Sequence, residues 1–393
     1  MKGTRYISGQ ELTRRRQRVR EEMRRAGAGV LVAFGSPQLM ARGLLRWLAD
    51  WPTPVFEEYL VMPLEGPVTL FVHDASEAEF AGACCAADEV RVIPAADYVS
   101  DPCRGAAELV RALGAERAAT AGRGMSAAFR ASLAQNLAGT KLISLDLRLE
   151  RLRMVKSQEE VRLSEAAVKL NEEVFRHYAG LVKPGGRELD AVAEASRFAL
   201  SLGAEELYWM SASGPVPGLA LMAQARERTH IWEKRDCHCI ILEHAAAGGH
   251  MGETTHLISL GRPKEEYARA FAAVGEAQLA AAGKIRPGAR VGELAAAAEE
   301  ALRGCGYDGC FTPGGAIGHG QGADVWEIPC IAAGNETLIE PGMRFNLHPS
   351  VRLGDGPAGS LRQGAVITSC DCWISEESGA RRLSSLPREI IEV

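Results

Sequence analysis

The sequence predicts an α+β protein of two domains, an N-terminal α/β domain followed by a larger α+β domain. In the first 150 residues, short strand patterns alternate with helical patterns, which is typical of a mixed sheet flanked by helices. From about residue 156, long helical patterns alternate with paired short strands. The length of 393 residues also exceeds the usual domain size of about 100–150 residues. We place the two domains at residues 1–153 and 154–393.

Glycine and proline mark the ends of the elements expected in the N-terminal domain. The charged helical pattern near the start ends at Gly27, and Gly35-Ser36-Pro37 stops the apolar run that follows. Glu65-Gly66-Pro67 separates two apolar runs and predicts a hairpin. The expected elements are a helix over 11–26, strands over 30–34, 59–63 and 68–72, and a helix over 105–114.

A helix start signal opens the second domain. Ser157 is followed three residues later by Glu160, which predicts a capping box that satisfies two free backbone N–H groups of the first turn. The helix should extend to about Leu181. A turn at Lys183-Pro184-Gly185-Gly186 should then lead into a second helix over 188–202.

The rest of the C-terminal domain shows paired strands and two more helices. Ala247-Gly248-Gly249 lies between two strand patterns and predicts the turn that joins them as an antiparallel pair. Pro287 and Gly288 divide the two helical patterns. The expected elements are strands over 237–243, 254–260, 345–348 and 365–374, and helices over 264–282 and 291–304.

Composition and charge narrow the class of protein. The formal charge of −5 and the pI near 6.1 favour neither nucleic acid nor a membrane surface as a partner. No apolar stretch reaches the roughly 18 residues of a membrane span, and no signal-peptide core follows the basic N-terminus. The ten cysteines lack the spacing of a secreted disulfide domain, so we expect reduced thiols in a cytoplasmic protein. The abundance of Ala, Arg and Gly is typical of a bacterial chain.

Five short motifs occur in the same order as in a known family. They are Lys156-Ser157-x-x-Glu160-Val161, Ile285-Arg286-Pro287-Gly288, Gly318-His319-Gly320-x-Gly322 with Glu327-x-Pro329, Leu338-x-x-Pro341-Gly342-Met343, and Gly379 through Leu383 to Pro387-Arg388. With these motifs the chain resembles the creatinase/prolidase family, which includes aminopeptidase P. Residues 43–48 are similar to a landmark of the family's N-terminal domain. The resemblance implies a creatinase-type N-terminal domain, a C-terminal pita-bread domain and a homodimer.

The resemblance also implies where a metal site would lie, and the sequence departs from the family there. The family's metallopeptidases bind two metal ions with two aspartates, one histidine and two glutamates. The histidine is retained as His319, and the second aspartate falls on Glu253. Glu243 lies about two positions from the place of the first aspartate, and the two glutamates fall on His348 and Cys370.

The number of carboxylates limits how many metal ions such a site can hold. Two divalent ions in one site need several anionic oxygens to balance their charge. The family set supplies four carboxylates and this chain supplies two, so we expect no two-metal centre and no cofactor. One zinc or manganese ion is the alternative, because Glu243, His319, His348 and Cys370 are all acceptable ligands.

The leading hypothesis is a creatinase-like hydrolase that cleaves a C–N bond of a small molecule without metal. The resemblance to creatinase implies that this fold can hydrolyse a C–N bond without metal. The essential histidine of creatinase, however, corresponds to Leu221 here. His319 would transfer protons, because a histidine pKa lies nearest neutrality. Glu243 and Glu253 would bind the substrate nitrogen, since neighbouring carboxyls separate their pKa values into an acid and a base. His348 would orient the leaving group.

Four further residues are expected to contact the substrate: Trp326, Glu327, Cys370 and His250. Trp326 stands where the family has a second histidine, and it suggests an apolar or cationic group in the substrate. Each candidate also has a structural interpretation, such as a core tryptophan or a buried cysteine. The run 237–239 (Cys-His-Cys) does not predict a zinc knuckle, because strand alternation places its two cysteines on one face and its histidine on the other.

Two other functions stay open from the sequence. One is a mononuclear metal-dependent hydrolase or lyase, which similarity alone would name an Xaa-Pro peptidase. The other is a non-catalytic binding protein on the same scaffold, as the histone chaperones of this superfamily imply. Metal analysis separates the first from the leading hypothesis, and partner binding that survives mutation of the histidines would indicate the second.

Overall fold

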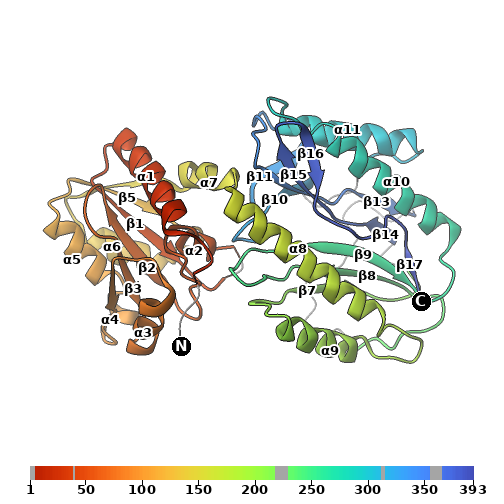
Figure 1. Ribbon diagram of the computed structural model, residues 1–393, viewed down its shortest axis with the longest axis horizontal. Coiled ribbons are helices and arrows are strands. Elements are labelled where there is room, and N and C mark those ends of the chain that lie inside the picture. The colour runs from red at the N-terminus through yellow and green to blue at the C-terminus, as the bar shows by residue number, and fades with distance from the viewer. Residues whose placement is uncertain (1–4, 39, 217–228, 311–314, 355–364) are drawn as a thin grey trace. The chain divides into compact units, whose positions relative to one another are not determined.

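The computed structural model describes residues 5–38, 40–216, 229–310, 315–354 and 365–393 (Figure 1). The chain forms two compact units. The first comprises Met1–Arg153 with Ala323–Val325, and the second comprises Met154–Gly322 with Trp326–Val393. Leu221, at the position of the essential histidine of creatinase, lies outside the described residues.

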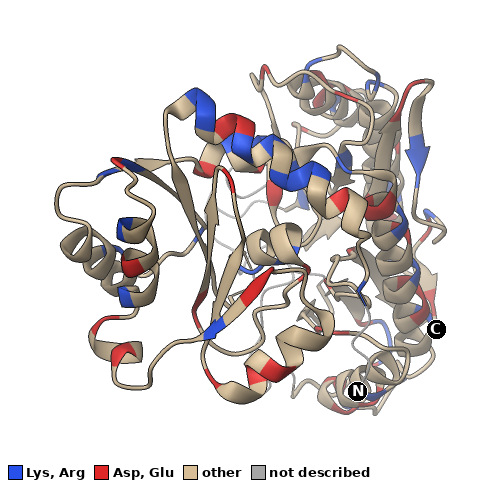
Figure 2. Cartoon of the chain, turned by 60° about the vertical axis from the view of Figure 1, so that its left-hand side comes forward, with Lys and Arg blue, Asp and Glu red and all other residues tan. Residues whose placement is uncertain are grey.

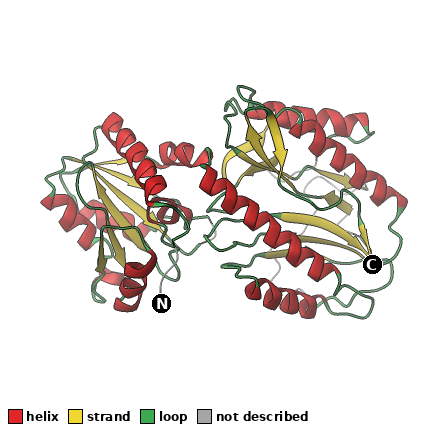
Figure 3. Ribbon diagram, in the orientation of Figure 1, coloured by secondary structure: helices red, strands yellow, loops and turns green. Residues whose placement is uncertain are grey.

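A six-stranded mixed sheet forms the centre of the first unit (Figure 3). Its order is β4-β3-β2-β1-β5-β6, with β1, β2 and β3 antiparallel and the outer pairings parallel. The antiparallel pairing of β2 with β3 confirms the predicted hairpin at Gly66. The strands are β1 (Val30–Gly35), β2 (Glu58–Pro63), β3 (Thr69–Val72), β4 (Glu89–Val92), β5 (Arg117–Ala121) and β6 (Lys141–Ser144).

Helices cover both faces of this sheet, which explains why β1 is apolar throughout. Leu31 and Ala33 pack into the core beneath α1, α2 and α3, whereas Val32 and Phe34 pack into the core beneath α5 and α6. The helices are α1 (Gly9–Ala26), α2 (Gly43–Ala49), α3 (Ala75–Cys84), α4 (Asp97–Ser100), α5 (Arg104–Ala112), α6 (Ala127–Asn136) and α7 (Asp146–Met154).

One sheet of the second unit has the order β17-β9-β8-β7. In it, β8 (Cys237–Leu242) and β9 (Thr254–Ser259) form the predicted antiparallel pair, and the outer strands are β7 (Trp209–Ala212) and β17 (Ile391–Glu392). Helices α8 (Gln158–Ala179) and α9 (Glu188–Ser201) pack on the face that carries Ile240 and Leu242. Ser157 and Glu160 form the predicted capping box at the start of α8.

The second sheet of this unit has the order β11-β10-β12-β15-β16. Its strands are β10 (Ala316–Gly320), β11 (Glu327–Ala332), β12 (Arg344–Leu347), β15 (Asp371–Glu376) and β16 (Gly379–Arg382), and β13 (Ser350–Leu353) pairs separately with β14 (Ala365–Thr368). Helices α10 (Glu265–Ala282) and α11 (Val291–Gly304) share one apolar core with strands of both sheets.

The prediction of one final strand over 365–374 is wrong in one respect, because the structure has two strands there. β14 pairs with β13, whereas β15 pairs with β12 and β16. Between them the backbone N–H of Cys370 donates to the carbonyl of Thr255 over 3.0 Å. The chain therefore changes pairing partners at Ser369 and Cys370, which an apolar run in the sequence cannot reveal.

Basic and acidic residues are interspersed along the helices (Figure 2). Within the part of the chain that the structure describes, no helix has the length and apolar character needed to cross a membrane. All ten cysteines are free thiols.

Candidate active site

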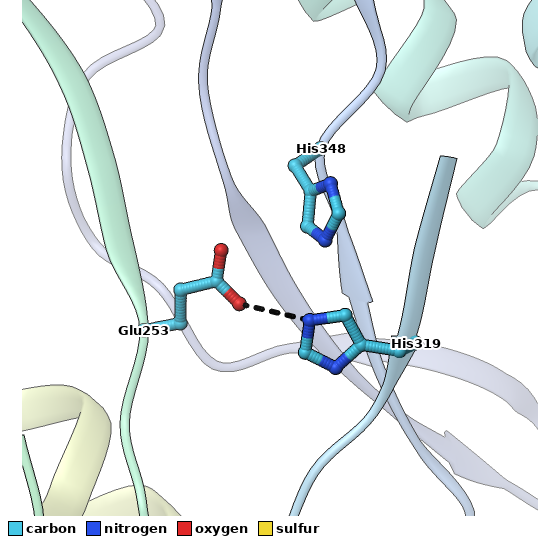
Figure 4. A group of neighbouring side chains, drawn as sticks. All are labelled: Glu253, His319 and His348. Atoms are coloured by element: carbon cyan, nitrogen blue, oxygen red, sulfur yellow. Dashed lines mark ion pairs between the residues drawn. The ribbon is translucent and has the colours of Figure 1, made fainter. Parts of the chain in front are cut away.

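Three side chains from separate segments of the second unit converge. Glu253 immediately precedes β9, His319 lies on β10, and His348 immediately follows β12. Figure 4 shows the three side chains pointing toward one another. One potential ligand atom from each lies within 4.8 Å of the others. Among the described residues, this is the one group of histidine, cysteine and acidic side chains with that spacing.

Glycines on either side of His319 allow β10 to reach this position. A Cβ at Gly318 would lie 2.0 Å from the backbone oxygen of Asn346, and a Cβ at Gly320 would lie 2.4 Å from that of Ile328. Neither approach is possible for a side chain, so β10 can pair closely with β12 and β11 only with glycine at both positions. The Gly-His-Gly run therefore places the imidazole by permitting close strand packing.

A hydrogen bond and an aromatic contact fix the ring of His319. Its Nδ1 lies 2.9 Å from the backbone oxygen of Gly320, so Nδ1 carries the ring proton. Its Nε2 is then an acceptor, and it lies 3.7 Å from Oε2 of Glu253. The indole of Trp326 stacks on the imidazole with a centroid distance of 4.2 Å and an interplanar angle of 18°. Metal-binding histidines commonly show this arrangement, with one ring nitrogen donating to the protein and the other free.

Glu253 is buried and held by polar neighbours. Asn346 donates from Nδ2 to Oε2 of Glu253 over 2.8 Å. Burial alone would raise the pKa of this carboxyl, but the nearby His348 and His319 and the Asn346 hydrogen bond together lower the pKa below its ordinary value. Glu253 is therefore ionised at neutral pH.

Burial acts in the opposite direction on the charge of His319. It lowers the pKa of the imidazole to about 4, although the negative charge of Glu253 partly offsets this effect. His319 is consequently neutral at pH 7. A neutral imidazole with a free Nε2 can accept a proton or bind a metal ion.

Glu243 differs from Glu253 in its protonation state. It follows β8 and is buried, with 6% of its surface exposed. Burial and then the negative charge of Glu253 raise its pKa well above the ordinary value. Burial therefore favours the protonated form of Glu243, whereas the polar neighbours of Glu253 favour its ionised form. It is not a member of the three-residue group.

Arg344 is a neighbour of this site that the sequence analysis did not single out. Its side chain is buried and donates to Oε1 of Gln321 over 2.6 Å, while its NH2 lies 3.9 Å from Sγ of Cys372. Strand alternation on β12 puts Arg344 on the same face as Asn346 and His348, and this two-residue spacing is the signal that could have identified Arg344.

Cys370 does not take the place of the missing glutamate. Burial, together with the neighbouring Cys372 and Glu253, raises the pKa of its thiol well above the ordinary value. A metal ion that bound Cys370 would have to displace this proton, because the thiolate is the form that binds. The structure thus groups Glu253, rather than Glu243 or Cys370, with the two histidines, which corrects the ligand set expected for a single ion.

Two of the other expected substrate contacts have protein partners instead. Glu327 forms an ion pair with Nζ of Lys156, and each of these side chains is 2% exposed. Because removing one partner of a buried pair is strongly destabilising, the ion pair indicates a structural role for this carboxylate, and its contact with substrate stays a prediction. His250 lies with Nδ1 3.2 Å from Oγ of Ser164 on α8. A role of Trp326 in binding substrate stays a prediction.

The Cys-His-Cys run of β8 follows the expected alternation. Cys237 and Cys239 lie in the core shared with α10, whereas Nε2 of His238 lies 2.7 Å from the hydroxyl of Tyr178 on α8. The two cysteines and the histidine therefore face opposite sides of the sheet and form no common metal site.

Two family models match this chain. The model of metallopeptidase family M24 matches residues 162–378, and that of the creatinase/prolidase N-terminal domain matches residues 15–155. Fold and site thus define a two-domain protein of the pita-bread class, which confirms the resemblance to the creatinase/prolidase family. Because the first model covers more than half of the sequence, the chain belongs to metallopeptidase family M24.

Similar proteins have peptidase names. The uncharacterised peptidase YqhT of Bacillus subtilis is 26% identical over 288 residues, which cover 72% of this chain and 77% of YqhT. The probable dipeptidase PepE of Mycobacterium bovis is 28% identical over 263 residues, 66% of each chain. The crystal structure of an X-Pro aminopeptidase from Thermotoga maritima shares the fold, with a TM-score of 0.81, 21% identity and coverage of 96% of this chain and 99% of that one. The family and these relatives support a hydrolase.

Proposed function

We propose that the chain hydrolyses a C–N bond of a small molecule at Glu253, His319 and His348, and that these side chains hold one divalent ion. The observation that carries the proposal is the pair of acceptors, Oε2 of Glu253 and Nε2 of His319, at 3.7 Å. Oε2 already accepts from Asn346, and the ring proton of His319 is on Nδ1. No proton is therefore available between the two acceptors, and a cation placed between them would stabilise both.

A single ion of the zinc type fits this set of ligands. Zinc binds histidine nitrogen and glutamate oxygen at about 2.0–2.2 Å, so two of its ligand atoms lie at most about 4.4 Å apart. The 3.7 Å separation meets that limit. Two histidines and one glutamate are a recurring set in catalytic zinc sites, where they leave a position for water or substrate. Manganese is also acceptable to imidazole and carboxylate ligands.

A pair of ions does not fit the same residues. Glu253 contributes one negative charge, burial favours the neutral form of Glu243, and the buried Arg344 adds a positive charge nearby. Two divalent ions would bring four positive charges into surroundings that are almost neutral. We therefore propose one ion here rather than the pair that the family's metallopeptidases bind.

The remaining side chains have defined tasks in a hydrolysis. A bound ion would polarise the substrate carbonyl and lower the pKa of water. Glu243, held in the acid form by burial, can donate a proton to the departing nitrogen, which is a poor leaving group without one. Trp326 keeps the plane of His319 fixed, and Asn346 keeps Glu253 oriented.

The metal-independent mechanism uses the same residues and is the second candidate. In it, neutral His319 accepts a proton from the attacking water and Glu243 protonates the leaving nitrogen. Oδ1 of Asn346 is buried without a hydrogen-bond partner among the described residues, so it is available to accept from that water. The names of the relatives favour an amide as the C–N bond, and X-Pro dipeptides are the first substrates to test.

Metal content and chelator sensitivity of the purified full chain decide between these mechanisms. We expect about one equivalent of zinc or manganese in the wild type and in a His177→Ala control, whose histidine is partly exposed on α8. Glu253→Gln and His348→Ala should lose the ion. Hydrolysis of dipeptides or small amides should stop with chelator and return with metal.

Other results would redirect the proposal. Hydrolysis without metal and without chelator sensitivity would establish the metal-independent mechanism. Two equivalents of metal would contradict both mechanisms. A metal-free protein that hydrolyses none of these compounds would favour the non-catalytic binding protein.

A further inference from the structure

A cavity of about 660 Å³ lies in the second unit at the opposite ends of β8 and β9 from Glu243 and Glu253. Cys237 at the start of β8, Ser259 at the end of β9 and the loop that leads into α10 line it. β8 spans six residues. At about 3.3 Å per residue, the cavity lies about 20 Å from the candidate active site, so the two are separate.

The lining of this cavity is strongly basic. Lys234, Arg235, Arg262 and Lys264 line it, and Val393 is the one lining residue with an acidic group, the carboxylate at the end of the chain, since no aspartate or glutamate side chain lines it. Within the described residues, the side chains of Lys234, Arg235 and Arg262 form no ion pair with a carboxylate. By contrast Arg269, one turn into α10, pairs with Glu265 at 2.7 Å.

Neighbouring groups offset only part of this positive charge. Asp236, between Arg235 and Cys237 in the sequence, adds one negative charge nearby, and its carboxylate accepts from the backbone N–H of Glu233 over 2.9 Å and lies 2.7 Å from Nε2 of His230. Burial raises the pKa of the Cys237 thiol to about 12, so the base of the cavity is uncharged. Nζ of Lys264 donates to the hydroxyl of Tyr267, a neutral partner, over 3.2 Å.

Four like charges around one concave surface repel one another and attract anions, since a cavity focuses the field of its walls. Guanidinium groups bind phosphate oxygens through two parallel hydrogen bonds, and lysines add point charges. The volume is within the range of about 300–1,000 Å³ that is usual for small-molecule sites. Size and charge together indicate a compact ligand with several negative charges.

We propose that this cavity is a second binding site, which takes a phosphate-bearing small molecule through Lys234, Arg235, Arg262 and Lys264. The site is independent of the proposed hydrolytic centre, because neither Glu253 nor the two histidines line it. The two arginines and two lysines would recognise the ligand by its phosphate groups, which carry at least two negative charges.

Calorimetric titration of the purified full chain with sodium tripolyphosphate tests the proposal. We expect saturable binding of one molecule per chain that weakens between 0.01 M and 0.15 M salt, where the Debye length falls from about 30 Å to about 8 Å. Arg262→Glu and Lys234→Glu should each weaken binding about tenfold or more, because each replaces a charge-assisted bond by repulsion. Citrate, titrated in parallel, should bind more weakly if phosphate geometry matters.

Two control variants make the result specific. Lys284→Glu makes the same charge change at an exposed position beyond the other end of α10, and it should bind like the wild type. His319→Ala should also bind normally, because the hydrolytic centre is not involved. Loss of binding in either control, or normal binding in both cavity variants, would overturn the proposal.

A measurement on the wild type alone guards against misfolded variants. Acetylation of lysines by an activated ester, read by mass spectrometry, should slow several-fold at Lys234 and Lys264 when tripolyphosphate is present. The rate at Lys284 should not change. Equal protection of all three lysines, or none, would contradict a built site and indicate non-specific association.

Discussion

Glu58 in the first unit allows a quantitative prediction of how stability depends on pH. Its side chain is fully buried on β2 and accepts a hydrogen bond from the indole of Trp51. Burial raises the pKa of this carboxyl to about 9, and the neighbouring Glu77 contributes in the same direction. The folded protein therefore holds Glu58 in its acid form.

The expected size of the effect follows from the difference between the two states. The pKa is about 9 in the folded chain and near 4.5 when the side chain is exposed, so a rising pH favours the unfolded chain between these values. At about 1.36 kcal/mol per pKa unit, keeping the proton costs about 2 kcal/mol at pH 6 and about 4–5 kcal/mol at pH 8. Below pH 4.5 this cost disappears.

The substitution Glu58→Gln removes the titratable carboxyl proton but keeps the size and shape of the side chain. The amide oxygen can still accept from Trp51, and the NH2 group can take the place of the carboxyl proton toward Glu77. Urea unfolding at 25 °C should show that the wild type loses about 2–3 kcal/mol more than the variant between pH 6 and pH 8. Amide hydrogen exchange of residues 58–63 reports on the same unit directly.

The control is Glu65→Gln, an exposed glutamate in the turn between β2 and β3. It should leave the pH dependence of stability unchanged. The reasoning is refuted if wild type and Glu58→Gln have parallel stability curves from pH 6 to pH 8, or if the difference between them is largest at acid pH.

Three further predictions concern the second unit. Lys156→Met leaves Glu327 buried without its partner and should lower the free energy of unfolding by about 3–5 kcal/mol in urea, while adding Glu327→Leu should restore part of the loss. Gly320→Ala places a Cβ 2.4 Å from a backbone oxygen, so the free energy of unfolding should fall by about 1–3 kcal/mol. Metal analysis should show less bound ion, because the neighbouring His319 is displaced. Burial lowers the pKa of His244 to about 3, below its ordinary value of 6.5, so stability is full above pH 6.5 and falls in acid. Between pH 6.5 and pH 5, the wild type should lose about 2 kcal/mol that His244→Gln keeps, and equal losses would contradict this assignment.

Local signals in the sequence were sufficient for much of the fold. The helix that became α8 is marked by the capping box of Ser157 and Glu160, which depends on neighbours three residues apart. The hairpin of β8 and β9 is marked by the glycines between them. By contrast, the change of partner between β14 and β15 depends on a bond from Cys370 to a strand more than a hundred residues earlier, and no local pattern reports it.

The candidate site was predictable in its composition but not in its geometry. Motif order identified Glu253, His319 and His348 as site residues, but the ligand set expected for a single ion contained Glu243 and Cys370 with the two histidines and left out Glu253. The distances between the side-chain ligand atoms decide between these residues, and these distances follow from how the two sheets of the second unit pack.

The sequence by itself therefore determined the family, the order of the helices and strands, and a deficit of carboxylates at the metal positions, because these depend on residue types and short spacings. Only the tertiary structure decided that the pKa values of the two glutamates shift in opposite directions, that Glu327 forms an ion pair with Lys156, and that four basic residues line one cavity. Each of these depends on the distance between charges far apart in the chain and on their distance from water, and only folding sets those distances.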